Sequence, residues 1–198
     1  MKRIFLILLI VPASLSITAQ SGKKIVVLYT NDMHSRLTGF GPESCYSPLS
    51  PDDDNTTGGF SRIAAIINKE KEQNEGTTIV LDAGDFLMGT LFQHLEAKSG
   101  FQLPLMKKMG YDVVCIGNHE FDFGPGKLAE IILTSARKGE LPVILLGNAV
   151  FSKKVGADDS LEDLFRSGAI SRKYILSRDG IKAGFFSLLG KVADENAA

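Results

Sequence analysis

The chain has 198 residues, enough for one sizeable domain core, and its 44% hydrophobic and 23% charged residues are typical of a globular protein. The formal net charge of −1 argues against a broad electrostatic surface for nucleic acid or anionic membrane, so no nucleic-acid binding is expected. A substrate phosphate would have to be held by local positive charge, either a metal ion or a few arginines.

The first twenty residues have the pattern of a secretory signal peptide. Lys2 and Arg3 precede an apolar run at 4–11, and a stretch of small residues follows and ends near Gln20. The apolar run is short for a bilayer span, and the alternatives are an uncleaved anchor or a core helix. We therefore expect an exported protein, periplasmic or extracellular, with residues 1–20 removed and no stable membrane anchor after cleavage.

Two cysteines are too few for a disulfide framework, and they form no CxxC metal signature. Cys115 lies in the apolar run YDVVCIG, where a buried thiol acting as a small hydrophobe is the favoured interpretation. Cys45 lies in a polar loop. Whether the two cysteines pair stays open at this point.

Apolar β-branched runs alternate with amphipathic helical patterns after the leader. The predicted strands are 24–30, which is interpreted as buried, 77–81, 113–116 and 143–146. Three helices are predicted. The first begins at Phe60 and ends before Gly76, the second ends at Gly110, and the third ends at Gly139. This alternation predicts an α/β fold with a mainly parallel sheet and helices on both of its faces.

The pattern changes near the end of the chain. Residues 174–177 and 182–189 read as two strands joined by a turn at Asp179 and Gly180. Asp-Gly between two apolar runs favours a tight antiparallel hairpin. We therefore expect a hairpin added to the parallel sheet.

Three of the predicted strands end in polar clusters, in the segments YTNDMH, LDAGDFLMGT and IGNHEFDFG. The C-terminal ends of parallel strands meet at one edge of a sheet, so these clusters are expected to come together there. So many acidic groups in one place would repel one another unless a cation lay among them. The pattern therefore predicts a metal site at this edge.

Several of these side chains have simpler alternative roles. Asp82 is more easily explained as a brace of the turn than as a ligand, and Asp85 could cap a helix N-terminus. Glu120 could satisfy only nearby backbone or an arginine. His94, on a helical stretch after Gly89, is interpreted as a surface residue.

The three segments resemble, in order and spacing, the sequence blocks of calcineurin-like metallophosphoesterases. The resemblance is strongest to the branch of secreted 5'-nucleotidases and 2',3'-cyclic-nucleotide phosphodiesterases, and the segments GGFSRIAAI, LPVILLGNAV and DGIKAGFFSLLG are similar as well. It implies that residues 24–198 are the N-terminal part of a four-layer α/β/β/α metallophosphoesterase domain.

The resemblance also implies a set of metal ligands for two divalent ions, such as zinc or manganese. Asp32 and His34 would bind the first ion, Asp85 would bridge both ions, and Asn118 would bind the second. Mixed oxygen and nitrogen ligands do not choose between such metals.

Two further residues have catalytic roles by the same resemblance. His119 would be the catalytic imidazole near the scissile phosphate, and Asp122 would orient it. Together with two metal ions that clamp a phosphoryl group, an imidazolium could stabilise developing charge or protonate the leaving oxygen. The implied function is a secreted 5'-nucleotidase.

Other functions stay open on the sequence alone. One is a 2',3'-cyclic-nucleotide phosphodiesterase or another secreted phosphatase, and another is a truncated domain that binds without catalysis. An unrelated nucleotide- or sugar-binding α/β protein is disfavoured because the chain has no strand-linked GxGxxG, no Walker A pattern and no GxSxG.

The resemblance further implies that the chain is incomplete. The family's additional metal-binding histidines lie further along, whereas this sequence has three histidines, His34, His94 and His119. Since metal affinity follows the number and placement of ligands, we expect the chain alone to be poorly active.

Overall fold

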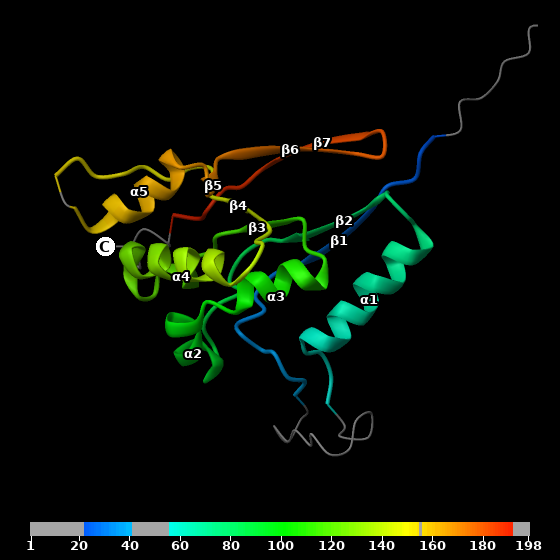
Figure 1. Ribbon diagram of the computed structural model, residues 1–198, viewed down its shortest axis with the longest axis horizontal. Helices are drawn as coiled ribbons and strands as arrows, with labels where there is room; N and C mark the ends of the chain where they lie inside the picture. Colours follow the sequence, from blue (N-terminus) through cyan, green and yellow to red (C-terminus); the bar gives the residue numbers. More distant parts are fainter. Residues whose placement is uncertain (1–21, 41–55, 155, 192–198) are drawn as a thin grey trace, which may run out of the picture.

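The structure is a computed structural model that describes residues 22–40, 56–154 and 156–191. Its centre is a five-stranded parallel sheet in the order β1–β2–β3–β4–β5 (Figure 1). The strands are β1 (Val26–Thr30), β2 (Thr78–Asp82), β3 (Val113–Cys115), β4 (Val143–Leu145) and β5 (Ile170–Ser171). The predicted signal peptide at 1–20 and Cys45 lie outside the described residues, and Cys115 is half-buried.

Helices pack against one side of this sheet (Figure 1). They are α1 (Phe60–Gln73), α2 (Phe92–Ser99), α3 (Gln102–Met109), α4 (Gly124–Lys138) and α5 (Asp159–Arg166), with the short turns η1 (His119–Phe121) and η2 (Gly156–Asp158). In α4, the buried residues Leu128, Ile131 and Ile132 follow the i, i+3, i+4 spacing of an apolar helix face. None of the helices described is long and apolar enough to cross a bilayer.

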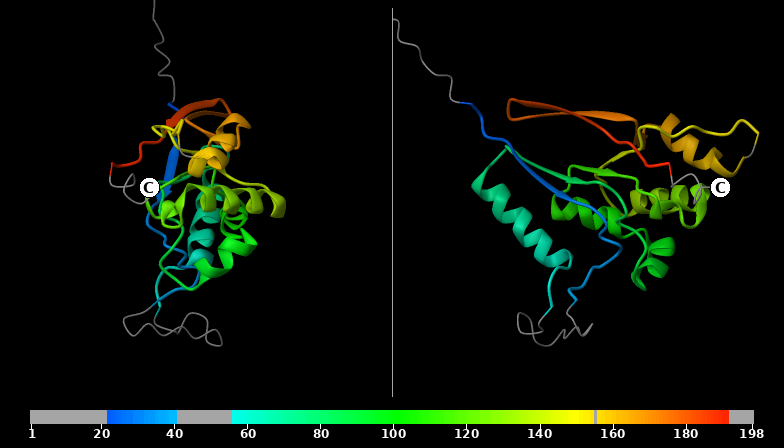
Figure 2. Two further views of the ribbon diagram at one scale, coloured as in Figure 1. Left: turned by 90° about the vertical axis from the view of Figure 1, so that its left-hand side faces the viewer. Right: turned by 180° about the vertical axis from the view of Figure 1, so that it is seen from behind.

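The opposite side of the sheet is covered by an antiparallel hairpin, β6 (Lys173–Arg178) and β7 (Ile181–Phe186) (Figure 2). Its turn residues Asp179 and Gly180 have φ of 49° and 75°, the backbone that a two-residue hairpin turn requires. Leu176 and Ile181 pack with Ile79 of β2 in a second small core. The prediction of a mainly parallel sheet packed with helices is confirmed. The predicted helices on both faces are not found in the described residues, because the hairpin occupies the second face and the layers are helices, sheet and hairpin.

Strand β1 differs from its prediction as a buried strand. It lies at the edge of the sheet, where Ile25, Val27 and Tyr29 are 48%, 51% and 74% exposed. Val27 is paired with Ile79 of β2, so the two side chains share one face of the sheet. The hairpin covers Ile79 but leaves Val27 open, which is why the same apolar face is buried on one strand and exposed on the next.

The segment after β7 returns to the carboxyl edge of the parallel sheet. The hydroxyl of Ser187 accepts a hydrogen bond from the Gly147 N–H at 3.0 Å. The Asn148 side chain then bonds both backbone groups of Leu189, each at 2.9 Å. The chain that leaves the hairpin is therefore joined to the loop that follows β4.

A buried carboxyl group stabilises the start of α3. Glu96 is 0% exposed, and its carboxylate accepts the backbone N–H groups of Phe101 and Gln102. These bonds satisfy donors that have no partner within the helix. Burial raises the pKa of Glu96 from its ordinary value of 4.5 to about 7, and the hydrogen bonds offset part of that rise.

This pKa shift predicts that the metal-free protein becomes less stable as the pH rises from about 4.5 to 7. In that window the folded protein keeps the Glu96 proton that the unfolded chain has lost, so folding takes up a proton and is favoured by acid. The contribution of this group is on the order of 1–3 kcal/mol. Urea unfolding across this pH range should show a shallower pH dependence for Glu96→Gln, and an unchanged dependence would contradict the prediction.

Candidate metal centre

The loops that follow β1 and β2 are held side by side by their backbones. The hydrogen bonds are Asp32 N–H to Gly84 O at 3.0 Å, His34 N–H to Asp85 O at 3.0 Å and Ser35 N–H to Phe86 O at 2.9 Å. They continue the pairing of the two strands past the end of the sheet. Two of the predicted ligand segments therefore have a fixed position relative to each other.

Several residues in these loops have left-handed backbone conformations. They are Asp32 with φ 52°, His34 with φ 47°, Ser35 with φ 52° and Asp85 with φ 58°. Asp and His are enriched among the non-glycine residues that adopt this conformation, but each still costs about 1–3 kcal/mol. The interloop hydrogen bonds offset this cost and hold the carboxylates and the imidazole in place.

The loop after β3 brings the third predicted segment to the same point. The backbone N–H of His119 donates to Asp85 Oδ1 at 2.9 Å. Gly117 lies so close that an added Cβ would stand 2.2 Å from Asp85 Oδ1 and 2.5 Å from Asp85 N. Glycine is therefore required for the loops after β2 and β3 to meet.

We expect Gly117→Ala to destabilise the protein by about 3 kcal/mol, because the methyl group forces the two loops apart. Gly126→Ala in α4 is the matched control. Its added Cβ would meet only Ala157 O at 3.6 Å, and alanine favours a helix by up to about 1 kcal/mol. Denaturant unfolding of both variants checks the difference, and equal stabilities would contradict the close contact.

Three potential ligands converge where the loops meet. One ligand atom from each of His34, Asp85 and His119 lies within 4.8 Å of the other two, and all three residues are half-buried. The two imidazole rings are 5.0 Å apart at an interplanar angle of 72°. Asp32 is beside them, with its Oδ1 at 3.7 Å from His34 Nε2. Ligand atoms that share one ion at about 2.1 Å lie a few ångströms apart, so this cluster fits a divalent cation.

The remaining two predicted residues flank this cluster. Asn118 directly precedes His119 and is half-buried at the start of η1. Asp122 Oδ2 accepts a hydrogen bond from His119 Nδ1 at 2.9 Å, and this bond raises the pKa of His119 above its ordinary value of 6.5. A carboxylate can only accept, so the bond fixes the proton on Nδ1 and orients the ring.

The sequence matches the family model of calcineurin-like phosphoesterases over residues 25–183. The chain belongs to this family. The chain is 33% identical over 132 residues to the snake venom 5'-nucleotidase of Gloydius brevicauda, a match that covers 63% of this chain and 20% of the relative. It is 26% identical over 174 residues to the 2',3'-cyclic-nucleotide 2'-phosphodiesterase/3'-nucleotidase of Haemophilus influenzae, covering 82% of this chain and 24% of the relative.

A solved structure of the same fold is the 5'-nucleotidase precursor from Thermus thermophilus, which superimposes with a TM-score of 0.65 at 22% sequence identity. The match covers 86% of this chain and 29% of that one. This phosphoesterase chain thus spans about a fifth of the length of the curated relatives that it matches.

The structure decides between the alternative roles that the sequence left open for Asp85 and Asp82. Asp85 lies in a loop well before α2, so it does not cap that helix. Asp82 is buried and accepts the Thr30 hydroxyl at 2.6 Å and the Gly84 N–H at 3.0 Å, as expected of a brace. Burial raises the pKa of Asp82 to about 7. His94 is exposed on α2, as predicted.

Glu120 makes more structural contacts at the candidate metal centre than the sequence suggests. The residue is 3% exposed, and its carboxylate accepts three backbone N–H groups from the loops after β2 and β3. Burial raises its pKa to about 7. One sequence signal points to this role. Glu120 directly follows the candidate catalytic His119, in a loop that begins with Gly117.

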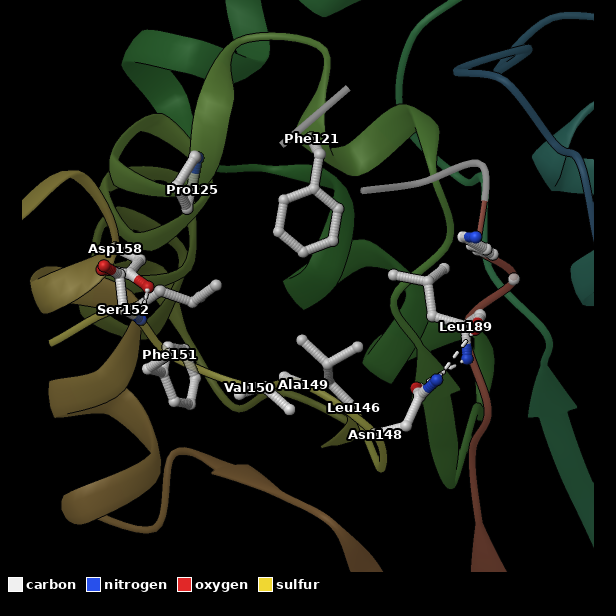
Figure 3. Close-up of a pocket in the computed structure, with 13 residues that line it drawn as sticks. Phe121, Pro125, Leu146, Asn148, Ala149, Val150, Phe151, Ser152, Asp158 and Leu189 are labelled. Atoms are coloured by element: carbon white, nitrogen blue, oxygen red, sulfur yellow. Dashed lines mark hydrogen bonds between the residues drawn. The ribbon is translucent and has the colours of Figure 1, made fainter. Parts of the chain in front are cut away.

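A cavity of about 760 Å³ lies next to η1 in this phosphoesterase domain (Figure 3). The ring of Phe121 points into it from the turn that carries His119, and Pro125, Phe151 and Leu189 line it (Figure 3). None of the candidate metal ligands lines it. The cavity is therefore a neighbour of the cluster and not the metal site itself.

Proposed function

We propose that the protein is a metal-dependent phosphoester hydrolase that acts on nucleotides, with 5'-nucleotidase activity as the first candidate. The observation that carries this proposal is the convergence of His34, Asp85 and His119 within 4.8 Å at the ends of three parallel strands. Family membership over residues 25–183 and relatives named 5'-nucleotidases support it.

Four side chains are proposed to hold two divalent ions, zinc, manganese or similar. Asp32 and His34 would hold the first, Asp85 would bridge both, and Asn118 would hold the second. When bound, two such ions clamp a phosphoryl group and lower the pKa of a bound water. The backbone pairing of the loops fixes the main-chain positions of Asp32, His34 and Asp85 relative to one another, which supports their proposed role as ligands.

His119 and Asp122 are proposed as the catalytic pair. Asp122 holds the proton of His119 on Nδ1, which leaves Nε2 to face the substrate. A raised pKa favours the imidazolium form of His119. This form stabilises negative charge on the phosphoryl oxygens and supplies a proton to the leaving oxygen.

The domain organisation proposed with this function has a signal peptide at 1–20 and the N-terminal part of a metallophosphoesterase domain at 24–198. Export to the periplasm or the extracellular space follows from the leader pattern. The 198-residue chain is proposed to be poorly active by itself, because four protein ligands shared between two ions hold the second ion weakly.

Phosphate release from AMP tests the function. The assay compares this chain with the same chain extended by the sequence immediately downstream in its gene, each with and without Mn²⁺ or Zn²⁺. Metal-dependent release that is lost on chelation supports the proposal. Absence of release from the extended protein in both metals would refute it.

A 2',3'-cyclic-nucleotide phosphodiesterase is the second candidate. The Haemophilus influenzae relative of that name matches 82% of this chain, more than the 5'-nucleotidase of Gloydius brevicauda does. Turnover of 2',3'-cyclic AMP or of bis-p-nitrophenyl phosphate in preference to AMP would favour this reading. Nucleotide binding without turnover and without metal would favour a non-catalytic domain instead.

A further inference from the structure

We propose that Glu120 is a positioning residue that fixes Asp85 against the Asn118–His119 segment by binding the backbones of both loops. The inference rests on the proposed metal centre, and it assigns to Glu120 no contact with metal or substrate. It concerns how the ligand geometry is maintained.

The contacts of the Glu120 carboxylate span two strand ends. Oε2 accepts the N–H of Asp85 at 2.9 Å and the N–H of Gly117 at 2.6 Å, and Oε1 accepts the N–H of Leu87 at 2.9 Å. Asp85 and Leu87 follow β2, whereas Gly117 follows β3. One buried side chain therefore joins two loops that are distant in the sequence.

The partners of Glu120 are backbone dipoles. Among the described residues, no lysine or arginine forms an ion pair with it, which excludes the arginine pairing that the sequence left open. Three N–H groups directed at one carboxylate stabilise its charge in a buried place. They also impose a geometry, because all three bonds require both carboxylate oxygens.

Asp85 is held at two points by this arrangement. Its backbone N–H donates to Glu120, and its Oδ1 accepts the N–H of His119 at 2.9 Å. Gly117 packs against the same Asp85 carboxylate. A shift of Glu120 would therefore move the Asp85 carboxylate relative to Asn118 and His119, and with it the spacing of the candidate ligands.

Glu120→Gln removes one acceptor and places an amide NH₂ against backbone donors, so the three bonds cannot all form. Loss of such an outer partner typically lowers metal affinity 10- to 100-fold. The control is Asp112→Asn, a carboxyl-to-amide change at the opposite edge of the sheet. Asp112 accepts the Val80 N–H at 2.9 Å and pairs with Arg178, so its loss affects stability but not the ligand loops.

The experiment is a Co²⁺ titration of the chelator-treated 198-residue chain, followed by visible absorption, which reports the coordination geometry of the ion. We expect Glu120→Gln to bind Co²⁺ 10- to 100-fold more weakly and with a changed spectrum. Asp112→Asn should keep the wild-type affinity and spectrum. Glu120→Asp, which keeps both acceptor oxygens, should recover part of the affinity.

The possible outcomes separate this inference from the proposed function. A wild-type chain that binds no Co²⁺ would overturn the metal centre itself. Wild-type binding that Glu120→Gln leaves unchanged in affinity and spectrum would overturn the positioning role alone.

Amide hydrogen exchange of the wild type covers the case in which Glu120→Gln does not fold. The N–H groups of Asp85, Leu87 and Gly117 should be protected together, since all three donate to one buried acceptor. Rapid exchange at these three amides would overturn the inference without any variant.

Discussion

Asp85→Asn should lower the affinity of the chain for Mn²⁺ or Zn²⁺ by at least about 100-fold. Outer partners of metal ligands already account for 10- to 100-fold, and a carboxylate proposed to bridge two ions has a larger effect. Asparagine tolerates the left-handed backbone of this position, where φ is 58°, so the substitution changes the ligand and not the loop. Calorimetric titration of chelator-treated protein measures the loss.

Asp163→Asn is the matched control for Asp85→Asn. Asp163 lies on α5 with 69% of its side chain exposed, and it forms an ion pair with Arg166. The same chemical change at this surface position should leave metal affinity unaltered. If Asp85→Asn bound metal as tightly as Asp163→Asn, Asp85 would not be a ligand and the proposed centre would have to be abandoned.

His119→Asn should reduce phosphoester turnover by about 10²- to 10⁴-fold in the protein that releases phosphate in the AMP assay, which is the usual contribution of general acid–base catalysis. Metal affinity should change much less than in Asp85→Asn, because His119 is proposed to act on the substrate. The turnover rate at saturating metal, measured with AMP, separates the two effects.

The other histidines give this second experiment its controls. His94 is exposed on α2, so His94→Asn should have wild-type turnover. A ring nitrogen of His119 also lies within 4.8 Å of the ligand atoms of His34 and Asp85. The same experiment therefore tests whether His119 binds the metal. Loss of metal affinity in His119→Asn as large as in Asp85→Asn would show that His119 binds the metal and would contradict its assignment as a purely catalytic group.

The convergence of the polar clusters could be predicted from the sequence because it follows from topology. Parallel strands that end in polar residues place those residues at one edge, whatever the details of packing. The hairpin at Asp179 and Gly180 could also be predicted from the sequence, because few residue types fit a two-residue turn with positive φ. Sheet topology determined the first arrangement, and a local turn pattern determined the second.

The exposure of β1 could not be predicted in the same way. An apolar run reads alike in a central strand and in an edge strand, and only the position of the hairpin over Ile79 leaves Val27 uncovered. Bonding of Glu120 to nearby backbone was among its predicted roles, but its contact with a second loop was not. Its partners are backbone groups, and two of them, Asp85 and Leu87, belong to a loop from another part of the chain. Every residue except proline has a backbone N–H, so the residue types do not reveal which loop donates to Glu120.

The positive φ values of Asp32, His34 and Asp85 affect how substitutions at the site are to be interpreted. Alanine at these positions removes a functional group and also introduces a residue that resists the required conformer, so an alanine scan would merge two penalties into one loss. Asparagine and glycine keep the conformer accessible and isolate the chemistry. The amino acids accepted at these positions are limited both by the left-handed backbone and by the need for a metal-binding side chain. Asp, Asn and His meet both requirements.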